Sequence, residues 1–281
     1  MMSRLLVVLA LVVGMLGMGG WPAGAAPAKC QVKNLTTRVN YNGSLQSALN
    51  AANNGDTIRV KGVCVGNFLI PGAGSVTNLT LVGEPGHRVR STLDGNNSGT
   101  VLTVDFITSV VHVTLKDLRI TGGGQGGIVN FGSVTLAGRS SVSDNTGRGI
   151  FTAGSLTLND RSSVSRNTGG GIDDEGAVTL NGRSSVSRNT AQDGGGIFDD
   201  DTFLALNDRS SVTGNTATLG GGIYEIGHLT LSGRASVTHN TATVAGGGIL
   251  AFGGVDVCPS WTGVISPNTP DDPPTVTPVT C

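Results

Sequence analysis

Acidic side chains are concentrated in one short stretch of this 281-residue chain. The chain has 19 aspartates and glutamates, and seven of them lie between positions 173 and 201. They are Asp173, Asp174, Glu175, Asp193, Asp199, Asp200 and Asp201. Carboxylates at this density can ligate a cation, form an acid and base pair, or keep a turn solvated.

Each of these three chemistries involves a different set of residues. A solvated turn needs no partner at all. A hydrolytic pair needs two carboxyls about 5 to 9 Å apart, and its candidate catalytic residues are Asp174, Asp199 and Asp200. Calcium takes six to eight oxygen ligands, and the candidate metal ligands are Asp174, Glu175, Asp199, Asp200 and Glu225.

A repeat between Gly132 and Gly253 supplies the elements that must position these residues. Five copies of an aliphatic triplet start at Val134, Leu156, Val178, Leu204 and Leu229. An arginine follows each triplet, and successive arginines are 22, 22, 26 and 25 residues apart. A period in this range, made of short β segments and glycine turns, is typical of a stacked solenoid.

Each copy has three segments with strand character. The triplets alternate aliphatic and mostly polar residues, the second segment centres on a valine, and the third centres on an isoleucine. No copy can bury its own apolar face, so the core forms only when copies stack. The sequence therefore predicts an all-β fold, a single-stranded right-handed parallel β-helix with three short strands per coil. A ladder of side-chain amides is expected at Asn145, Asn167, Asn189, Asn215 and Asn240.

Alignment on the isoleucines predicts which side chains meet on adjacent coils. It places Asp174 beside Asp199 and then Glu225, and Glu175 beside Asp200, about 5 Å apart. Such crowding is unfavourable unless a cation bridges the oxygens or one carboxyl stays protonated. Residues directly after the isoleucines are predicted to point outward, where aromatic rings can stack on sugars. A shifted strand phase would bury these rings instead. The aromatic members of this column are Phe151, Phe198 and Tyr224.

Two parts of the chain resemble known families. Thr190-Ala191 through Gly194-Gly195-Gly196-Ile197, and the matching segment from Thr216 to Tyr224, resemble the repeats of bacterial polymorphic outer-membrane proteins. Near the N-terminus, Leu45-Gln46-Ser47-Ala48-Leu49 and Asn54-Gly55-Asp56-Thr57-Ile58 resemble the opening of secreted β-helices of the pectin-lyase-like superfamily. The resemblance implies the fold, but this superfamily includes lyases, hydrolases, adhesins and proteins with no known activity.

A polysaccharide lyase or a glycoside hydrolase is one activity that the resemblance implies. In a pectate-lyase-like enzyme, calcium on the acidic cluster would bind a uronate carboxylate while an arginine removes a ring proton. The candidate bases are Arg148, Arg166 and Arg188. The Gly-His-Gly and Arg-Ile-Lys sequences typical of polygalacturonases are absent, as is the Arg-x-Pro-x-x-Arg pattern of the major pectate-lyase family. These absences favour binding without catalysis.

Four cysteines fit an oxidising compartment. Of the three possible pairings, proximity in the chain favours Cys30 with Cys64 and Cys258 with Cys281. The two ends of a solenoid expose core and strand edges, and both need a cap. Ser44 is a candidate N-cap for a short helix over the first coil, and the Pro-rich residues 258–281 are expected to form the C-terminal cap.

The N-terminus has the features of a secretory signal peptide. A basic start precedes an apolar run from Leu5 to Met18, which is short for a membrane span, and then the small residues Ala23-Gly24-Ala25. We therefore expect a cleaved signal peptide at residues 1–25, the β-helix at 26–257 with regular coils over 132–253, and the cap at 258–281. This organisation predicts a secreted, extracellular protein with no membrane span after cleavage.

Composition limits the partners. A net charge of −1 with 13% charged residues indicates no nucleic-acid-binding surface. The four histidines lack metal-ligand spacing. We expect a monomeric surface protein that binds extracellular polysaccharide or another cell-surface component, as an interaction or adhesion module without assumed catalysis. Calcium is the one cofactor that the acidic cluster suggests.

Overall fold

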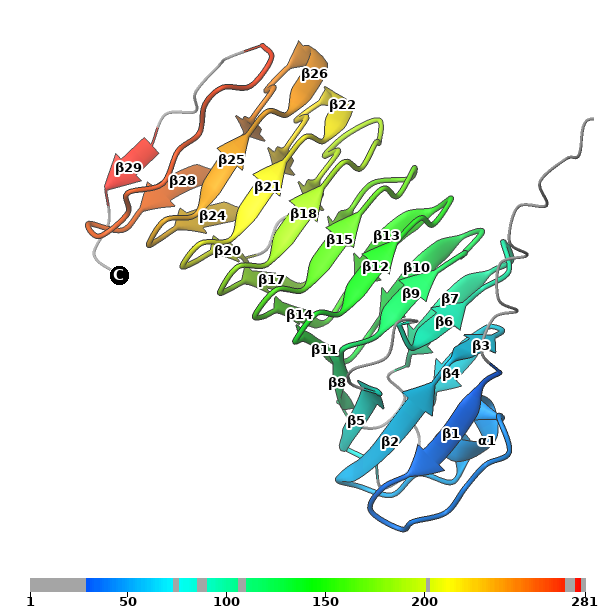
Figure 1. Cartoon of the computed structure of the whole chain (residues 1–281). Coiled ribbons are helices and arrows are strands. Elements are labelled where there is room, and N and C mark those ends of the chain that lie inside the picture. The colour runs from blue at the N-terminus through cyan, green and yellow to red at the C-terminus, as the bar shows by residue number, and fades with distance from the viewer. Residues whose placement is uncertain are drawn as a thin grey trace, which may run out of the picture.

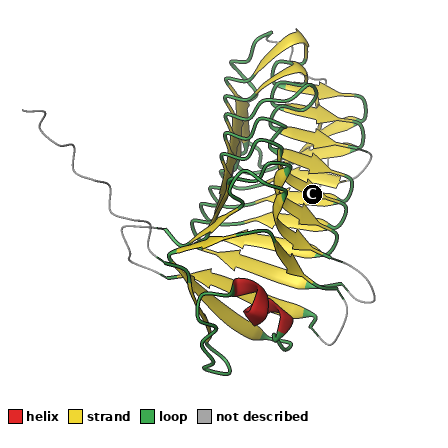
Figure 2. Ribbon diagram, turned by 90° about the vertical axis from the view of Figure 1, so that its right-hand side faces the viewer, coloured by secondary structure: helices red, strands yellow, loops and turns green. Residues whose placement is uncertain are grey.

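The protein is a parallel β-solenoid whose coils stack along one axis (Figure 1). The computed structural model describes residues 29–72, 76–84, 90–105, 110–200, 203–270 and 276–278. Three long sheets of 11, 8 and 8 strands run along the stack, and a fourth sheet has two strands. Figure 2 shows the sheets as the walls of the solenoid, with the only helix of the described ranges at one end. The expected all-β parallel β-helix with three strands per coil is confirmed.

The sheets are numbered in the order in which a coil visits them. Sheet 1 consists of β1 (Gln31–Asn34), β2 (Asp56–Lys61), β5 (Asn78–Gly83), β8 (His112–Lys116), β11 (Ser133–Ala137), β14 (Ser155–Leu158), β17 (Ala177–Leu180), β20 (Phe203–Leu206), β24 (His228–Leu231), β28 (Gly254–Val257) and β29 (Val276–Pro278). Sheet 2 consists of β3 (Val63–Val65), β6 (Thr92–Asp94), β9 (Arg119–Thr121), β12 (Ser141–Ser143), β15 (Ser163–Ser165), β18 (Ser185–Ser187), β21 (Ser211–Thr213) and β25 (Ser236–Thr238). Sheet 3 consists of β4 (Phe68–Ile70), β7 (Thr100–Val104), β10 (Gly126–Asn130), β13 (Arg148–Thr152), β16 (Ile172–Asp174), β19 (Ile197–Asp199), β23 (Ile223–Glu225) and β27 (Ile249–Ala251). Sheet 4 consists of β22 (Thr216–Leu219) and β26 (Thr241–Ala245).

The register of the strands is the one that the repeat predicts. Leu156 of sheet 1 pairs with Val178, Val164 of sheet 2 with Val186, and Ile150 of sheet 3 with Ile172. These side chains are at most 1% exposed. Because side chains alternate between the two faces of a strand, each coil adds one aliphatic layer to a continuous core.

The expected asparagine ladder runs along the corner between sheets 2 and 3. Asn189 donates from Nδ2 to Asn215 Oδ1 at 3.0 Å, and its own Oδ1 accepts the Nδ2 of Asn167 at 3.0 Å. The backbone N–H of each asparagine donates to the same Oδ1 of the next one, as from Asn167 to Asn189 at 3.0 Å. The ladder continues to Asn268, which accepts from Asn240 Nδ2 at 3.1 Å. This last member lies outside the repeat and was not predicted.

The glycine before each isoleucine is required by close backbone approach. A Cβ atom on Gly196 would lie 2.5 Å from the Gly222 carbonyl oxygen and 2.8 Å from Asn215 Nδ2. Contacts this short cannot be relieved by a rotamer change, because one of the atoms belongs to the backbone of the next coil. The glycine runs therefore allow the backbones of adjacent coils to approach closely enough to stack.

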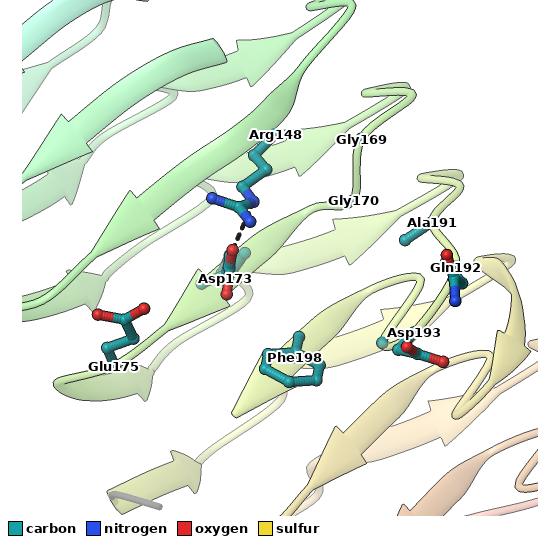
Figure 3. A pocket seen from close by; sticks show the side chains of 11 residues that line it. Arg148, Gly169, Gly170, Asp173, Glu175, Ala191, Gln192, Asp193 and Phe198 are labelled. Carbon is teal, nitrogen blue, oxygen red and sulfur yellow. Dashed lines mark ion pairs between the residues drawn. The ribbon is translucent and has the colours of Figure 1, made fainter. Parts of the chain in front are cut away.

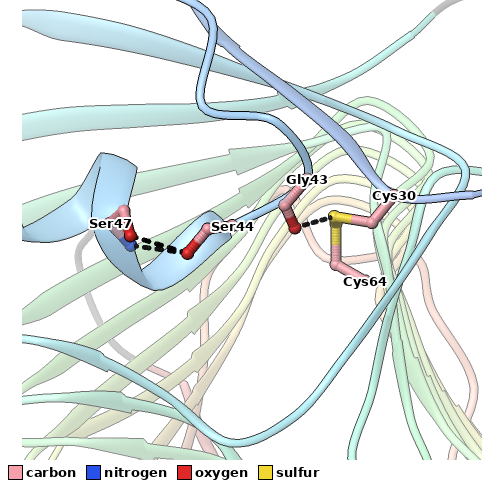
Figure 4. Close-up of a disulfide and its surroundings, with 5 residues drawn as sticks. All are labelled: Cys30, Gly43, Ser44, Ser47 and Cys64. Atoms are coloured by element: carbon pink, nitrogen blue, oxygen red, sulfur yellow. Dashed lines mark hydrogen bonds between the residues drawn. A yellow bond between two sulfur atoms is a disulfide. The ribbon is translucent and has the colours of Figure 1, made fainter.

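The N-terminal end is capped as expected. Helix α1 (Leu45–Asn50) has Ser44 as its N-cap, whose hydroxyl accepts the Ser47 N–H at 3.2 Å. The predicted Cys30–Cys64 disulfide joins the segment before β1 to β3 (Figure 4). Gly43 has φ +83°, and a Cβ there would lie 2.7 Å from the Cys30 carbonyl oxygen, so only glycine fits beside the disulfide.

The C-terminal segment extends the stack by part of a further coil. Val264 forms a parallel bridge with Ser236, and Thr269 forms one with Thr241. Strand β29 adds to β28 in parallel. Cys258 is disulfide-bonded, and its expected partner Cys281 lies outside the described residues. Because of its prolines, this segment lacks the alternating pattern from which these strand pairings could have been predicted.

The expected signal peptide, residues 1–25, also lies outside the described residues. In the part of the chain that the structure does describe, no helix is both long and apolar enough to cross a lipid bilayer.

Candidate functional site

The outward face of sheet 3 carries the predicted column of aromatic residues. Phe151 pairs with Asp173, Asp173 with Phe198, and Phe198 with Tyr224, one per coil. All four are partly exposed, while the isoleucines beside them are buried. The strand phase is therefore the one that points these side chains to solvent.

The rings of this face form two groups. Phe198 and Tyr224 stack with their centroids 5.2 Å apart and their planes 18° apart. Phe252 extends this group, with its centroid 5.4 Å from that of Tyr224. Phe131 and Phe151 form an edge-to-face pair at 6.0 Å. We call these five residues the aromatic platform.

Sequence reasoning missed two members of the platform. Phe131 is 43% exposed and Phe252 is 64% exposed. Both lie just beyond the ends of their strands, two residues after the outward position, where the other coils have Ala153, Glu175, Asp200 or Ile226. The chemical type at this position varies from coil to coil, so no periodic signal marked it.

A charged pair lies between the two aromatic groups. Arg148 Nε is 2.5 Å from Asp173 Oδ2, and its guanidinium carbon is 5.7 Å from the Phe151 ring centroid. Burial raises the pKa of Asp173, and Arg148 opposes this shift. Glu175 and Asp200 are exposed just past the ends of β16 and β19.

A cavity of about 330 Å³ opens beside the charged pair (Figure 3). Arg148, Asp173 and Phe198 line it from the strands of sheet 3. Gln192 and Asp193 line it from the corner before β19. This corner is longer than those of earlier coils, with eight residues from Asn189 to Ile197 against five from Asn167 to Ile172. The extra residues form one wall of the cavity.

Three of the predicted site residues point into the core. Asp174, Asp199 and Glu225 are in register on β16, β19 and β23, and each is 0% exposed. The predicted adjacency is present, but it lies inside the coil, because the second residue after an inward isoleucine is again inward. Asp174 Oδ1 accepts the Gly176 N–H at 2.7 Å. Of the three candidate catalytic residues, only Asp200 is exposed.

Glu225 is the least satisfied of the three buried carboxyls. Among the residues that the structure describes, neither of its oxygens has a hydrogen-bond partner. Burial raises the pKa of Glu225 to about 7, with a further contribution from Asp199 and an opposing one from His228. Protonation of Glu225 is thus one way to relieve the repulsion between adjacent carboxylates that the sequence predicted.

The five candidate calcium ligands do not converge on one point. Asp174, Asp199 and Glu225 point inward, while Glu175 and Asp200 are exposed. Across the described ranges, no group of three or more His, Cys, Asp and Glu side chains is arranged to hold a metal ion. These residues therefore form no coordination sphere for the expected calcium ion.

The three candidate bases are dispersed. Arg148 lines the cavity and pairs with Asp173. Arg166 lies at the corner after sheet 2, where it pairs with Asp144. Arg188 occupies the same corner one coil further on. Only Arg148 is near the exposed acidic residues.

Searches against protein-family models, curated proteins and solved structures found no match.

Proposed function

We propose that the outward face of sheet 3 binds an extracellular polysaccharide chain lying along the stack of coils. The observation that carries this proposal is the group of Phe198, Tyr224 and Phe252 beside the cavity, in which Phe198 and Tyr224 are partly exposed and stack on each other, and the exposed Phe252 is tilted against Tyr224. Aromatic faces pack against the apolar faces of sugar rings. The polar groups of the cavity add hydrogen-bond partners for sugar hydroxyls.

The distribution of polar groups supports this assignment. Arg148 is a donor, while Asp173 and Glu175 are acceptors, and all three line the cavity next to Phe198. Binding sites typically combine an apolar surface with a few convergent polar groups that fix orientation. An extended ligand could contact the platform on several coils at once.

Binding without catalysis is the favoured form of this proposal. Asp174 and Asp199 are 0% exposed and cannot touch a ligand on the face of sheet 3. We further propose that the protein is secreted and related to pectin-lyase-like β-helices and polymorphic outer-membrane-protein repeats. The support is the parallel three-strand coil, the disulfide and the signal-like N-terminus.

Phe198→Ala and Tyr224→Ala are each expected to weaken polysaccharide binding by about tenfold, because each removes one stacking surface. The measurement is affinity electrophoresis of the purified protein in gels that contain neutral, uronic-acid or amino-sugar polysaccharides. The matched control is Phe203→Ala, which removes a 49% exposed phenylalanine from sheet 1. It should leave binding unchanged.

Product formation is followed in the same samples through reducing ends and unsaturated sugars, with calcium and with a chelator. Calcium-dependent product that disappears in Asp200→Ala would favour the lyase alternative. A loss of binding in Phe203→Ala equal to that in Phe198→Ala, or no binding to any polymer, would contradict the platform.

A further inference from the structure

A second cavity of about 330 Å³ lies on the outward face of sheet 2, a different wall of the solenoid from the aromatic platform. Its floor is made of serine hydroxyls from two adjacent strands, β12 and β15. Its rim is made of arginines from three different coils. The lining residues are Arg90, Arg119, Arg166, Ser141, Ser143, Ser163 and Ser165.

The serines of the floor are held in a fixed array. Ser141 pairs with Ser163, and Ser143 with Ser165, so that equivalent positions lie about 4.8 Å apart. Ser141 is 5% exposed and Ser143 is 2% exposed. The equivalent serines and threonines of β18, β21 and β25 are all partly exposed. Three of the four floor serines, Ser141, Ser143 and Ser165, are buried, whereas both serines of β18, outside the cavity, are partly exposed.

The arginines reach this floor from several positions. Arg119 occupies the column of Ser141 one coil earlier, since the two residues are register partners. Arg90 precedes β6, and its Nη1 donates to Ser141 Oγ at 3.3 Å. Arg166 follows β15 at the corner. Three guanidinium groups thus surround one patch of hydroxyls.

One carboxylate orients two of these arginines. Arg166 donates to Asp144 from Nε at 2.7 Å and from Nη2 at 2.9 Å, and Arg119 Nη2 donates to it at 2.7 Å. The hydrogen bond from Arg166 holds the pKa of Asp144 well below its usual range. Asp94 lies on β6, two strands before β12 in sheet 2, and does not line the cavity.

The charge of the cavity is unbalanced. Three guanidiniums line the cavity, and together with Asp144, which pairs with two of them, they have a formal charge of +2, in a protein whose net charge is −1. Each guanidinium has five N–H donors, and the bonds to Asp144 use only some of them. Arg90 has no ion pair among the residues that the structure describes.

We propose that this cavity binds a tetrahedral oxyanion, a sulfate or phosphate group, either as a free ion or as an ester on a polymer. Guanidinium forks match the oxygens of such anions, and charge-assisted hydrogen bonds are roughly twice as strong as neutral ones. The serine hydroxyls supply further donors that rotate to meet the remaining oxygens. The site is independent of the aromatic platform, because the two share no residue.

The experiment is an amide NMR titration of the full mature chain with sodium sulfate and with inorganic phosphate, at constant ionic strength set by sodium chloride. Saturable shifts of the amides around Ser141 and Ser163 are expected. Arg119→Gln should weaken sulfate binding by about tenfold, through the loss of one charge-assisted contact. Arg90→Gln, at an exposed position outside any strand, should do the same if Arg119→Gln does not fold.

Arg161→Gln is the matched control, because Arg161 is an exposed arginine of a neighbouring corner and its replacement changes the net charge equally. It should leave sulfate binding unchanged. Dextran sulfate and uncharged dextran separate the two sources of the anion. Tighter binding of dextran sulfate per sulfate group supports an ester on a polymer, and equal binding supports the free ion. Shifts no larger than those with chloride, or an equal loss in Arg161→Gln, would overturn the proposal.

Discussion

Glu225→Gln is expected to stabilise the protein above pH 7 by up to about 3 kcal/mol while leaving its stability nearly unchanged below pH 4.5. Glu225 is 0% exposed, and neither carboxyl oxygen has a hydrogen-bond partner in the described part of the chain. Ionising a carboxyl in this environment is unfavourable, because burial removes its hydration and Asp199 repels the new charge. A glutamine has nearly the same shape and stays neutral at every pH.

The sign of this pH dependence follows from proton linkage. The pKa of Glu225 rises from 4.5 in the unfolded chain to about 7 in the folded protein. Between these values the folded protein binds more protons than the unfolded chain, so the free energy of unfolding falls as pH rises. The contribution of Glu225 is fully present below pH 4.5 and is lost as pH rises through about 7.

Urea unfolding at a series of pH values measures this effect. The control is Glu175→Gln, which removes an exposed carboxyl from the residue directly after the end of β16. Its pH profile should parallel that of the unmodified protein. Parallel profiles for Glu225→Gln and the unmodified protein would mean that Glu225 is not the group that titrates.

Asn189→Ala is expected to lower the free energy of unfolding by about 4 kcal/mol. Asn189 is 1% exposed and makes four side-chain hydrogen bonds. Besides the bonds to Asn167 and Asn215, its Nδ2 donates to the Val164 carbonyl at 3.2 Å. Alanine would leave the N–H groups of Asn167 and the carbonyl of Val164 buried without these partners, and each unmet group costs about 1 kcal/mol or more.

A second, shorter asparagine ladder provides the control. Asn181 Nδ2 donates to Asn159 Oδ1 at 3.0 Å, and Asn207 Nδ2 donates to Asn181 Oδ1 at 2.9 Å. These residues are half-buried, so water can replace the lost bonds. Asn181→Ala should therefore cost about 1 kcal/mol. If Asn181→Ala and Asn189→Ala lowered the free energy of unfolding equally in urea, burial would not determine how much each ladder contributes to stability.

The fold was predictable because one physical pattern is repeated five times. Alternation in segments such as Leu156–Thr157–Leu158 sets which side chains face the core, and the equivalent positions of the copies set the strand register. The same logic correctly aligned Asp174 with Asp199 and pointed Phe198 outward. The choice of Asp174 as a site residue was wrong, because it lies two residues after Ile172 and so points inward, although carboxylates are rarely found in a core.

The missed features depend on residues that break the repeat. Phe252 and Phe131 join the platform from the ends of strands, where position alone does not fix direction. Asn268 belongs to a segment with proline-rich surroundings and no alternation. The Arg90 contact to Ser141 joins residues 51 positions apart through a long flexible side chain. The periodicity of the sequence cannot predict such a contact.

The coil lengths have a consequence for how this chain can be altered. The spacing of ladder asparagines grows from 22 to 26 and 25 residues, yet Leu156 to Asn167 and Leu229 to Asn240 are each 11 residues. Most of the added residues lie at the corner that contains β22 and β26. Residues can therefore be inserted at this corner, by evolution or by protein engineering, without a change to the buried core. Such insertions would add new surface beside Phe198 and Tyr224.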